Sequence, residues 1–99
     1  MFDYLKEKAP NINIANLTAG HIMGVQNYRI YLLYENIGKK EANDEVMRVL
    51  NSRLSSKLKI IDANIGNFTN RSYFQLQDKY KNKYNLYVMS KSDYQLLRN

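Results

Sequence analysis

The clearest hydrophobic pattern along the chain has helical spacing. Across residues 41–58, apolar residues recur three or four positions apart, and they are Ala42, Val46, Val49, Leu50, Leu54 and Leu58. This spacing predicts one amphipathic helix over 41–58, with Val46, Val49, Leu50 and Leu54 buried against the rest of the protein. Asn43 is the predicted N-cap, and Arg53 and Lys57 fall near the negative end of the helix dipole.

Four other segments have the composition of β-strands. Residues 27–35, Asn-Tyr-Arg-Ile-Tyr-Leu-Leu-Tyr-Glu, are aromatic and branched, lie between Gly24 and Gly38, and carry apolar residues on both faces. They predict a largely buried strand. Residues 59–65, 72–77 and 84–90 are shorter strand candidates, and the last two are expected to pair as a hairpin across residues 78–83.

The two ends of the chain carry weaker signals. Residues 2–8 are compatible with two helical turns before Pro10, and Asn11 or Asn13 is a predicted cap of a second short helix to about Ala19, ended by Gly20. The run Asn-Ile-Asn-Ile within it also alternates like a strand. Residues 93–98 predict a final helical turn capped by Ser92.

The elements together predict an α+β fold in one domain over residues 1–99. The expected order is β-α-β-β-β after short N-terminal helices, with an antiparallel-dominated sheet and one main helix on one face. A winged-helix arrangement, with the last two strands as the wing, is the alternative.

The amino-acid composition excludes some kinds of site and indicates the charge of a partner. It has no cysteine, so disulfides, thiolate metal sites and cysteine nucleophiles are excluded. Residues 1–50 balance six Lys/Arg against six Asp/Glu, whereas residues 51–99 carry nine against three, so the whole net charge of +6 lies in the second half. Such asymmetry favours a polyanionic partner. Abundant Asn, Lys, Tyr and Ile also indicate an AT-rich genome, which raises lysine content without any functional reason.

The basic charge is densest around the predicted hairpin. Residues 71–91 hold five Lys/Arg and one Asp, interleaved with aromatic residues. Ammonium groups replace counterions on phosphates, and aromatic rings stack on unpaired bases. The predicted nucleic-acid contacts are Arg71, Lys79, Tyr80, Lys81, Lys83, Tyr84 and Lys91, with Arg53 and Lys57 at the rim. The lysines at 79, 81 and 83 form a stripe if they continue a strand, and a basic loop tip if they do not. A solvated surface over packed tyrosines is the other interpretation.

No catalytic or cofactor motif is recognised in the sequence. His21 is the one histidine and has no accompanying ligand cluster, so neither a metal site nor a cofactor is expected. Gly20 and Gly24 lack the Lys-Ser/Thr ending of a phosphate loop. The acidic residues near the helix start are explained by its dipole. No signal sequence or membrane span is predicted, and a cytoplasmic, non-enzymatic protein is expected.

The segment Asn27–Glu35 resembles the central strand of the RelE-type ribonuclease toxins, which are also small, basic and free of cysteine. The resemblance covers nine residues and implies a ribonuclease. In that family two helices precede a run of strands, whereas the strongest predicted helix of this chain follows the matching strand. No catalytic residue is therefore transferred.

The expected function is a small non-catalytic nucleic-acid-binding protein from a phage, virus or mobile element, DNA and RNA being equally compatible. A protein-interaction module, such as an inhibitor of a host enzyme or a virion component, is the alternative, with tyrosines as anchors. A homodimer is also predicted, because a chain of this length has a small core and many amphipathic tyrosines.

Overall fold

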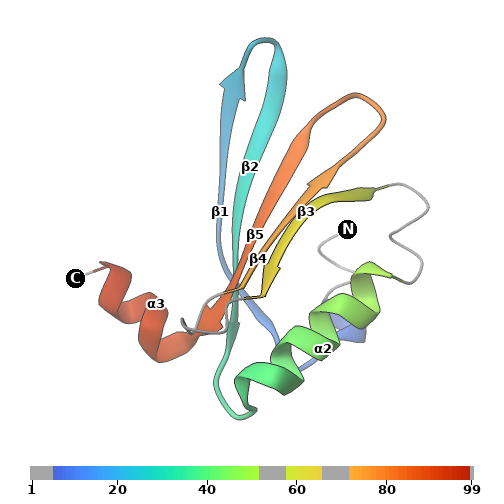
Figure 1. The fold of residues 1–99 in the computed structure, drawn as a ribbon. Coiled ribbons are helices and arrows are strands. Elements are labelled where there is room, and N and C mark those ends of the chain that lie inside the picture. The colour runs from blue at the N-terminus through green and yellow to red at the C-terminus, as the bar shows by residue number, and fades with distance from the viewer. Residues whose placement is uncertain (1–5, 52–57, 66–71, 99) are drawn as a thin grey trace.

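The computed structural model describes residues 6–51, 58–65 and 72–98 of the chain. They form an α+β fold built on a five-stranded sheet (Figure 1). The strands are β1 (Asn13–Ile22), β2 (Val25–Tyr34), β3 (Lys59–Ile65), β4 (Ser72–Gln77) and β5 (Lys83–Ser90). The helices with defined bounds are α2 (Lys39–Leu50) and α3 (Lys91–Arg98), and residues 6–8 are also helical.

The sheet order is β1-β2-β5-β4-β3. Strands β1 and β2 form an antiparallel hairpin, and β3, β4 and β5 form an antiparallel meander. The two units join through β2 and β5, which are parallel. Because α2 lies between β2 and β3 in the chain, it carries the chain from one unit to the other edge of the sheet. The sheet is therefore mixed, and the predicted order β-α-β-β-β is extended by β1.

The N-terminal prediction of a second short helix is wrong. Residues 13–22 form β1, so the second half of the alternating run Asn-Ile-Asn-Ile lies in a strand. Met23 and Gly24 connect β1 to β2 with φ of 52° and 85°. Positive φ at both central residues is typical of a type I′ hairpin turn, which matches the twist of the two strands. Gly24 thus has a conformational role in the turn.

Helix α2 is shorter than the sequence pattern predicts. It begins after Gly38, whose carbonyl accepts a hydrogen bond from the Ala42 N–H at 3.0 Å, so the predicted N-cap Asn43 lies inside the helix and is buried. It ends at Leu50, because Asn51 is its C-cap, and Leu58 is not helical. The predicted residues Arg53, Leu54 and Lys57 lie outside the described residues.

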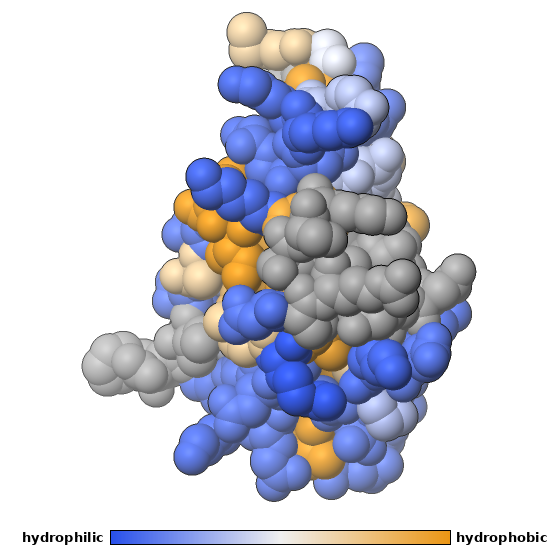
Figure 2. Space-filling view, turned by 90° about the vertical axis from the view of Figure 1, so that its right-hand side faces the viewer, coloured by the Kyte–Doolittle hydropathy of each residue, from blue (hydrophilic) through white to orange (hydrophobic). Residues whose placement is uncertain are grey.

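The hydrophobic core lies between α2 and one face of the sheet. Val46, Val49 and Leu50 are buried there, as predicted. Their partners include alternate residues of the inner strands, namely Ile30, Leu32, Tyr34, Phe74, Leu76, Leu86 and Val88. Figure 2 shows the molecule from the α2 side, where hydrophilic residues predominate and hydrophobic residues show in smaller areas.

The remaining strand predictions agree closely with the structure. The predicted bounds of β3 and β4 are confirmed, and β5 begins one residue earlier than predicted. The structure does not confirm a winged-helix arrangement, because β4 and β5 are inner strands with a neighbour on each side. The tail forms α3, with Ser90 as its cap in place of Ser92. The Ser90 hydroxyl oxygen accepts a hydrogen bond from the Asp93 N–H at 3.1 Å.

Candidate nucleic-acid interface on the open face of the sheet

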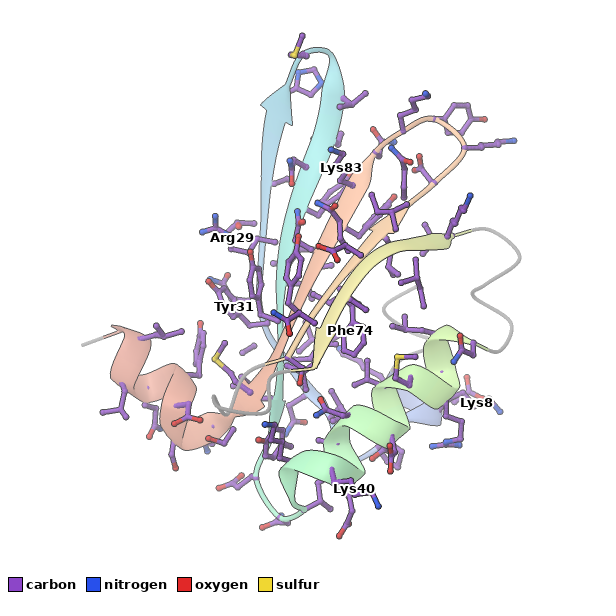
Figure 3. All side chains as sticks on the ribbon, viewed as in Figure 1. Lys8, Arg29, Tyr31, Lys40, Phe74 and Lys83 are labelled. Atoms are coloured by element: carbon purple, nitrogen blue, oxygen red, sulfur yellow. The ribbon has the colours of Figure 1, made fainter. Side chains whose placement is uncertain are left out.

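The face of the sheet opposite α2, called the open face below, carries polar and aromatic residues. Side chains alternate along each strand, so residues of β2 with odd numbers point away from the core residues Ile30 and Leu32. Figure 3 shows Arg29 and Tyr31 on this side, with Phe74 on the α2 side. Helix α3 lies on the open-face side of the sheet, at the opposite side from α2 (Figure 1).

Four tyrosine rings lie side by side across the open face, each in contact with the next. We call them the tyrosine row. Tyr94 of α3 packs against Tyr31 of β2 at 5.2 Å between ring centroids. Tyr31 stacks on Tyr87 of β5 at 5.4 Å, and Tyr87 meets Tyr73 of β4 at 5.2 Å. All four residues are half-buried. The strand register explains the arrangement, because Tyr31, Tyr87 and Tyr73 pair directly across adjacent strands.

A hydrogen-bonded network holds one end of the tyrosine row in place. Asn85, buried at the centre of the open face, accepts hydrogen bonds on Oδ1 from the Tyr73 hydroxyl and from Gln75 Nε2, both at 2.8 Å. Its Nδ2 donates to the Tyr28 carbonyl at 2.9 Å and to Asn27 Oδ1. One side chain therefore links β2, β4 and β5. Burial, followed by Tyr87 and Asp62, raises the pKa of Tyr73, so its hydroxyl stays protonated and donates.

Cations accompany the tyrosine row on the same face. Arg29 is exposed and lies two residues before Tyr31 on β2, about 7 Å along the strand. Lys83 and Lys59 flank Gln77 on neighbouring strands, on the face that also carries Tyr87. Asp62 of the edge strand β3 is the one acidic residue among the described strand positions of this face.

A hollow of about 320 Å³ lies at the Tyr94 end of the row. It is lined by Ala15, Asn16, Tyr31, Tyr94 and Leu97, so edge strand β1, β2 and α3 all contribute. Its lining consists of two phenol side chains, two apolar side chains and one amide.

The predicted contact residues of the hairpin fall in two places. Lys79, Tyr80 and Lys81 form the exposed β4–β5 loop, so the basic loop tip is observed and the continuous stripe is not. Lys81 has φ of 71°, a left-handed conformation that ends the alternation. Lys83 is the predicted lysine that lies on the open face.

The β4–β5 loop is ordered by Asp78. Its Oδ1 accepts backbone N–H bonds from Tyr80 and Asn82 at 2.9 and 3.0 Å, and its Oδ2 accepts bonds from Asn82 Nδ2 and the Tyr84 hydroxyl at 3.0 and 3.2 Å. Partial burial acts to raise the pKa of Asp78, but these hydrogen bonds outweigh it and lower that pKa below its usual value. The loop lysines therefore stand on a defined turn.

Two other predicted contacts have structural partners. Tyr84 lies on the α2 side, where its ring stacks on Tyr28 at 4.8 Å and its hydroxyl binds Asp78. Lys91, at the start of α3, forms an ion pair with Glu35 at 3.8 Å, with both side chains about half exposed. Arg71, Arg53 and Lys57 lie outside the described residues.

Reasoning from sequence missed the residues of the first half that face the same surface, Arg29 and Tyr31, and Tyr94 in the tail. The alternation of the β2 segment places Arg29 and Tyr31 on one face, which was the available signal. Their proximity to Tyr87 depends on the parallel pairing of β2 with β5, which no local pattern indicates.

Residues 6–51, 58–65 and 72–98 contain neither a metal-ligand cluster nor a helix that could span a membrane. There, no three His, Cys, Asp or Glu side chains gather as a metal site would need, and no helix is long and apolar enough to cross a membrane.

The architecture is that of a small α+β protein with a mixed five-stranded sheet and one main helix. Comparison of the chain with protein-family models, with curated proteins and with solved structures finds no match.

Proposed function

We propose that the chain is a non-catalytic binding protein for single-stranded nucleic acid and that the open face is its contact surface. The observation that supports this most directly is the tyrosine row: four half-buried rings in mutual contact on a sheet face, beside Arg29. Single-strand-binding sheets use aromatic rings as platforms for unpaired bases and cations for the backbone. In this proposal bases stack along the row. The phosphate contacts are Arg29, Lys83 and Lys59 on the open face, with Lys79 and Lys81 of the adjoining loop.

The residue types on this face favour nucleic acid over a second layer of core. The α2 side is apolar, as a face that packs against a main helix is. The open face has buried apolar residues at one end, Leu33 and Met89. Elsewhere it combines amides, phenol rings and cations, and its central polar groups satisfy one another through Asn85. Tyrosine rings present flat apolar faces at low entropic cost, which suits stacking. Phosphate and stacking contacts carry little base information, so we expect broad sequence tolerance.

The test is fluorescence anisotropy with a labelled single strand and a duplex of the same sequence, from low to physiological salt. Tyr31→Leu and Tyr87→Leu remove a stacking ring but retain apolar volume. Each should weaken single-strand binding about tenfold or more, because one base–aromatic stack contributes about 1–3 kcal/mol. Duplex binding should change less. The chain has nine tyrosines and no tryptophan, so quenching of tyrosine emission reports stacking directly.

Tyr80→Leu in the exposed loop is the matched control, because it removes a ring that lies outside the row. Its effect should be small compared with that of Tyr31→Leu. Absence of single-strand binding by the wild type at low salt would overturn the proposal. A salt-insensitive protein partner that requires Tyr31 would instead favour the protein-interaction alternative.

A further inference from the structure

Strand β1 is an edge strand with little protection against pairing. In the sheet order it has a neighbour on one side only, so its outer backbone groups face away from the sheet. Its sequence, Asn-Ile-Ala-Asn-Leu-Thr-Ala-Gly-His-Ile, contains no Asp, Glu, Lys, Arg or Pro. Every residue from Ala15 to His21 is exposed, including Leu17 at 48%. Long, uncharged edge strands are templates for pairing with another strand.

The opposite edge has the protection that β1 lacks. Strand β3 carries Lys59 and Asp62, and a register irregularity falls between Ile60 and Asp62, near its middle. Charges and bulges on an edge discourage pairing with other chains. In β1 the irregularity falls between Ile14 and Asn16, close to the N-terminal end, and residues 16–22 continue in regular register.

We propose that β1 pairs antiparallel with β1 of a second copy of this chain, about a two-fold axis at Thr18. This register places Thr18 opposite Thr18 of the partner, and Leu17 opposite Ala19. Opposed threonines and apolar pairs are favourable cross-strand contacts. Asn16 lies opposite Gly20, so no bulky pair meets on the open face. The two sheets then continue as one sheet of ten strands.

The charge distribution favours a second copy at this edge. Two chains of net charge +6 repel one another, and a contact that itself carries no charge adds least to this repulsion. Strand β1 has no charged residue, although Arg29 of β2 pairs with Thr18 and so lies one strand away from the proposed axis in each copy. A two-fold interface also needs one patch that is complementary to itself, which an antiparallel strand pair provides. The axis is normal to the sheet, so both open faces lie on the same side, and the association itself requires no nucleic acid.

The experiment is sedimentation equilibrium of the full chain over micromolar concentrations, in the absence of nucleic acid. The wild type should approach twice its chain mass of 11.7 kDa as concentration rises. Thr18→Lys places like charges directly opposite one another at the axis and should leave the chain monomeric. Gln95→Lys adds the same charge on an exposed position of α3 and should associate as the wild type does. Unchanged thermal unfolding of Thr18→Lys verifies its fold.

A second measurement tests the register. The chain has no cysteine, so Thr18→Cys introduces a single thiol at the proposed axis, where it should form a disulfide-linked dimer on mild oxidation. Gln95→Cys should not do so at the same concentration. A wild-type monomer throughout the concentration range, a Thr18→Lys dimer, or equal crosslinking of the two cysteine variants would each overturn the proposal.

Discussion

Asp78 shows how one carboxylate organises the β4–β5 loop. It accepts four hydrogen bonds from Tyr80, Asn82 and Tyr84, and it thereby joins the β4–β5 loop to the start of β5. These bonds need the ionised form, which is why they lower its pKa. The neighbouring Lys79 lies with its Nζ 5.0 Å from the centroid of the Tyr80 ring, so the loop also orders one of its own lysines.

We predict that acidification destabilises the protein partly through Asp78. Its folded-state pKa lies below the unfolded value of about 3.9, so its contribution is present above that value and is lost as pH falls through the folded pKa. Asp78→Asn should lower the free energy of unfolding at pH 7 by about 1–2 kcal/mol, and the difference from wild type should shrink in acid. Urea unfolding from pH 7 to pH 2 measures the free-energy difference between variant and wild type and its change with pH.

Asp44→Asn is the matched control, because it makes the same charge change at an exposed position of α2. It should change stability at pH 7 by no more than about 0.5 kcal/mol. An Asp78→Asn variant as stable as Asp44→Asn at pH 7 would contradict the role assigned to the Asp78 carboxylate.

Among the described elements, α2 is the main helix on the core face of the sheet. Its residues Val46, Val49 and Leu50 are at most 2% exposed and pack with the inner strands. The helix spans 12 residues, too short to be stable alone in water, so packing supplies most of its stability.

Leu50→Ala should therefore lower the free energy of unfolding by about 2–5 kcal/mol, because it removes buried volume that the sheet cannot refill. Denaturant unfolding monitored by circular dichroism measures the change. Glu41→Ala, on the exposed side of the same helix, should have little effect. A thermal midpoint unchanged by Leu50→Ala would show that the packing of α2 is misassigned.

Across the described part of the molecule, one group of basic residues lies near the open face and another lies near α2. Lys83 lies on the open face, and Lys79 and Lys81 occupy the adjoining loop. Lys8 and Lys40 lie near or on α2 (Figure 3). Net charge alone does not distinguish these groups, but the proposed phosphate contacts involve only the first group.

Replacing Lys79, Lys81 and Lys83 together by Ala should reduce the salt slope of single-strand binding by about 2, if each lysine meets one phosphate. Affinity should fall similarly for unrelated sequences. The control replaces Lys6, Lys8 and Lys40, all exposed, and removes the same charge. Equal slopes for the two triple variants would show that binding follows net charge and not this surface.

Much of the secondary structure was predictable because it is encoded locally. The composition of residues 59–65 and 72–77, with partial alternation in the first segment, predicts β3 and β4 with the observed bounds. Local signals failed where two of them competed. Asparagines at 11 and 13 suggested helix caps, whereas residues 13–22 form β1, and tertiary pairing with β2 decided between helix and strand. The end of α2 at Leu50 was also missed, because apolar spacing continues to Leu58.

The candidate site was also predictable only in part, because some of its contacts depend on strand pairing and not on local sequence. Charge composition indicated the loop around Lys79 and Lys81 without any knowledge of pairing. The contact between Tyr31 and Tyr87 joins residues far apart in the chain and needs the parallel register of β2 and β5. Tyr94 reaches the same row because α3 follows β5 and packs on the open-face side.

The sequence by itself determined the type of most elements, the residues that α2 buries, the excess of positive charge in the second half, and the absence of cysteine chemistry. These features depend on periodicity, which is a property of residues close together in the chain, and on composition, which is a count of residues. Only the tertiary structure decided that β2 and β5 are adjacent, that β1 is an uncharged edge, and that four tyrosines from α3, β2, β5 and β4 meet on one face. Strand order and register follow from burying one face of the whole sheet under α2, and that free energy depends on contacts between residues far apart in the chain.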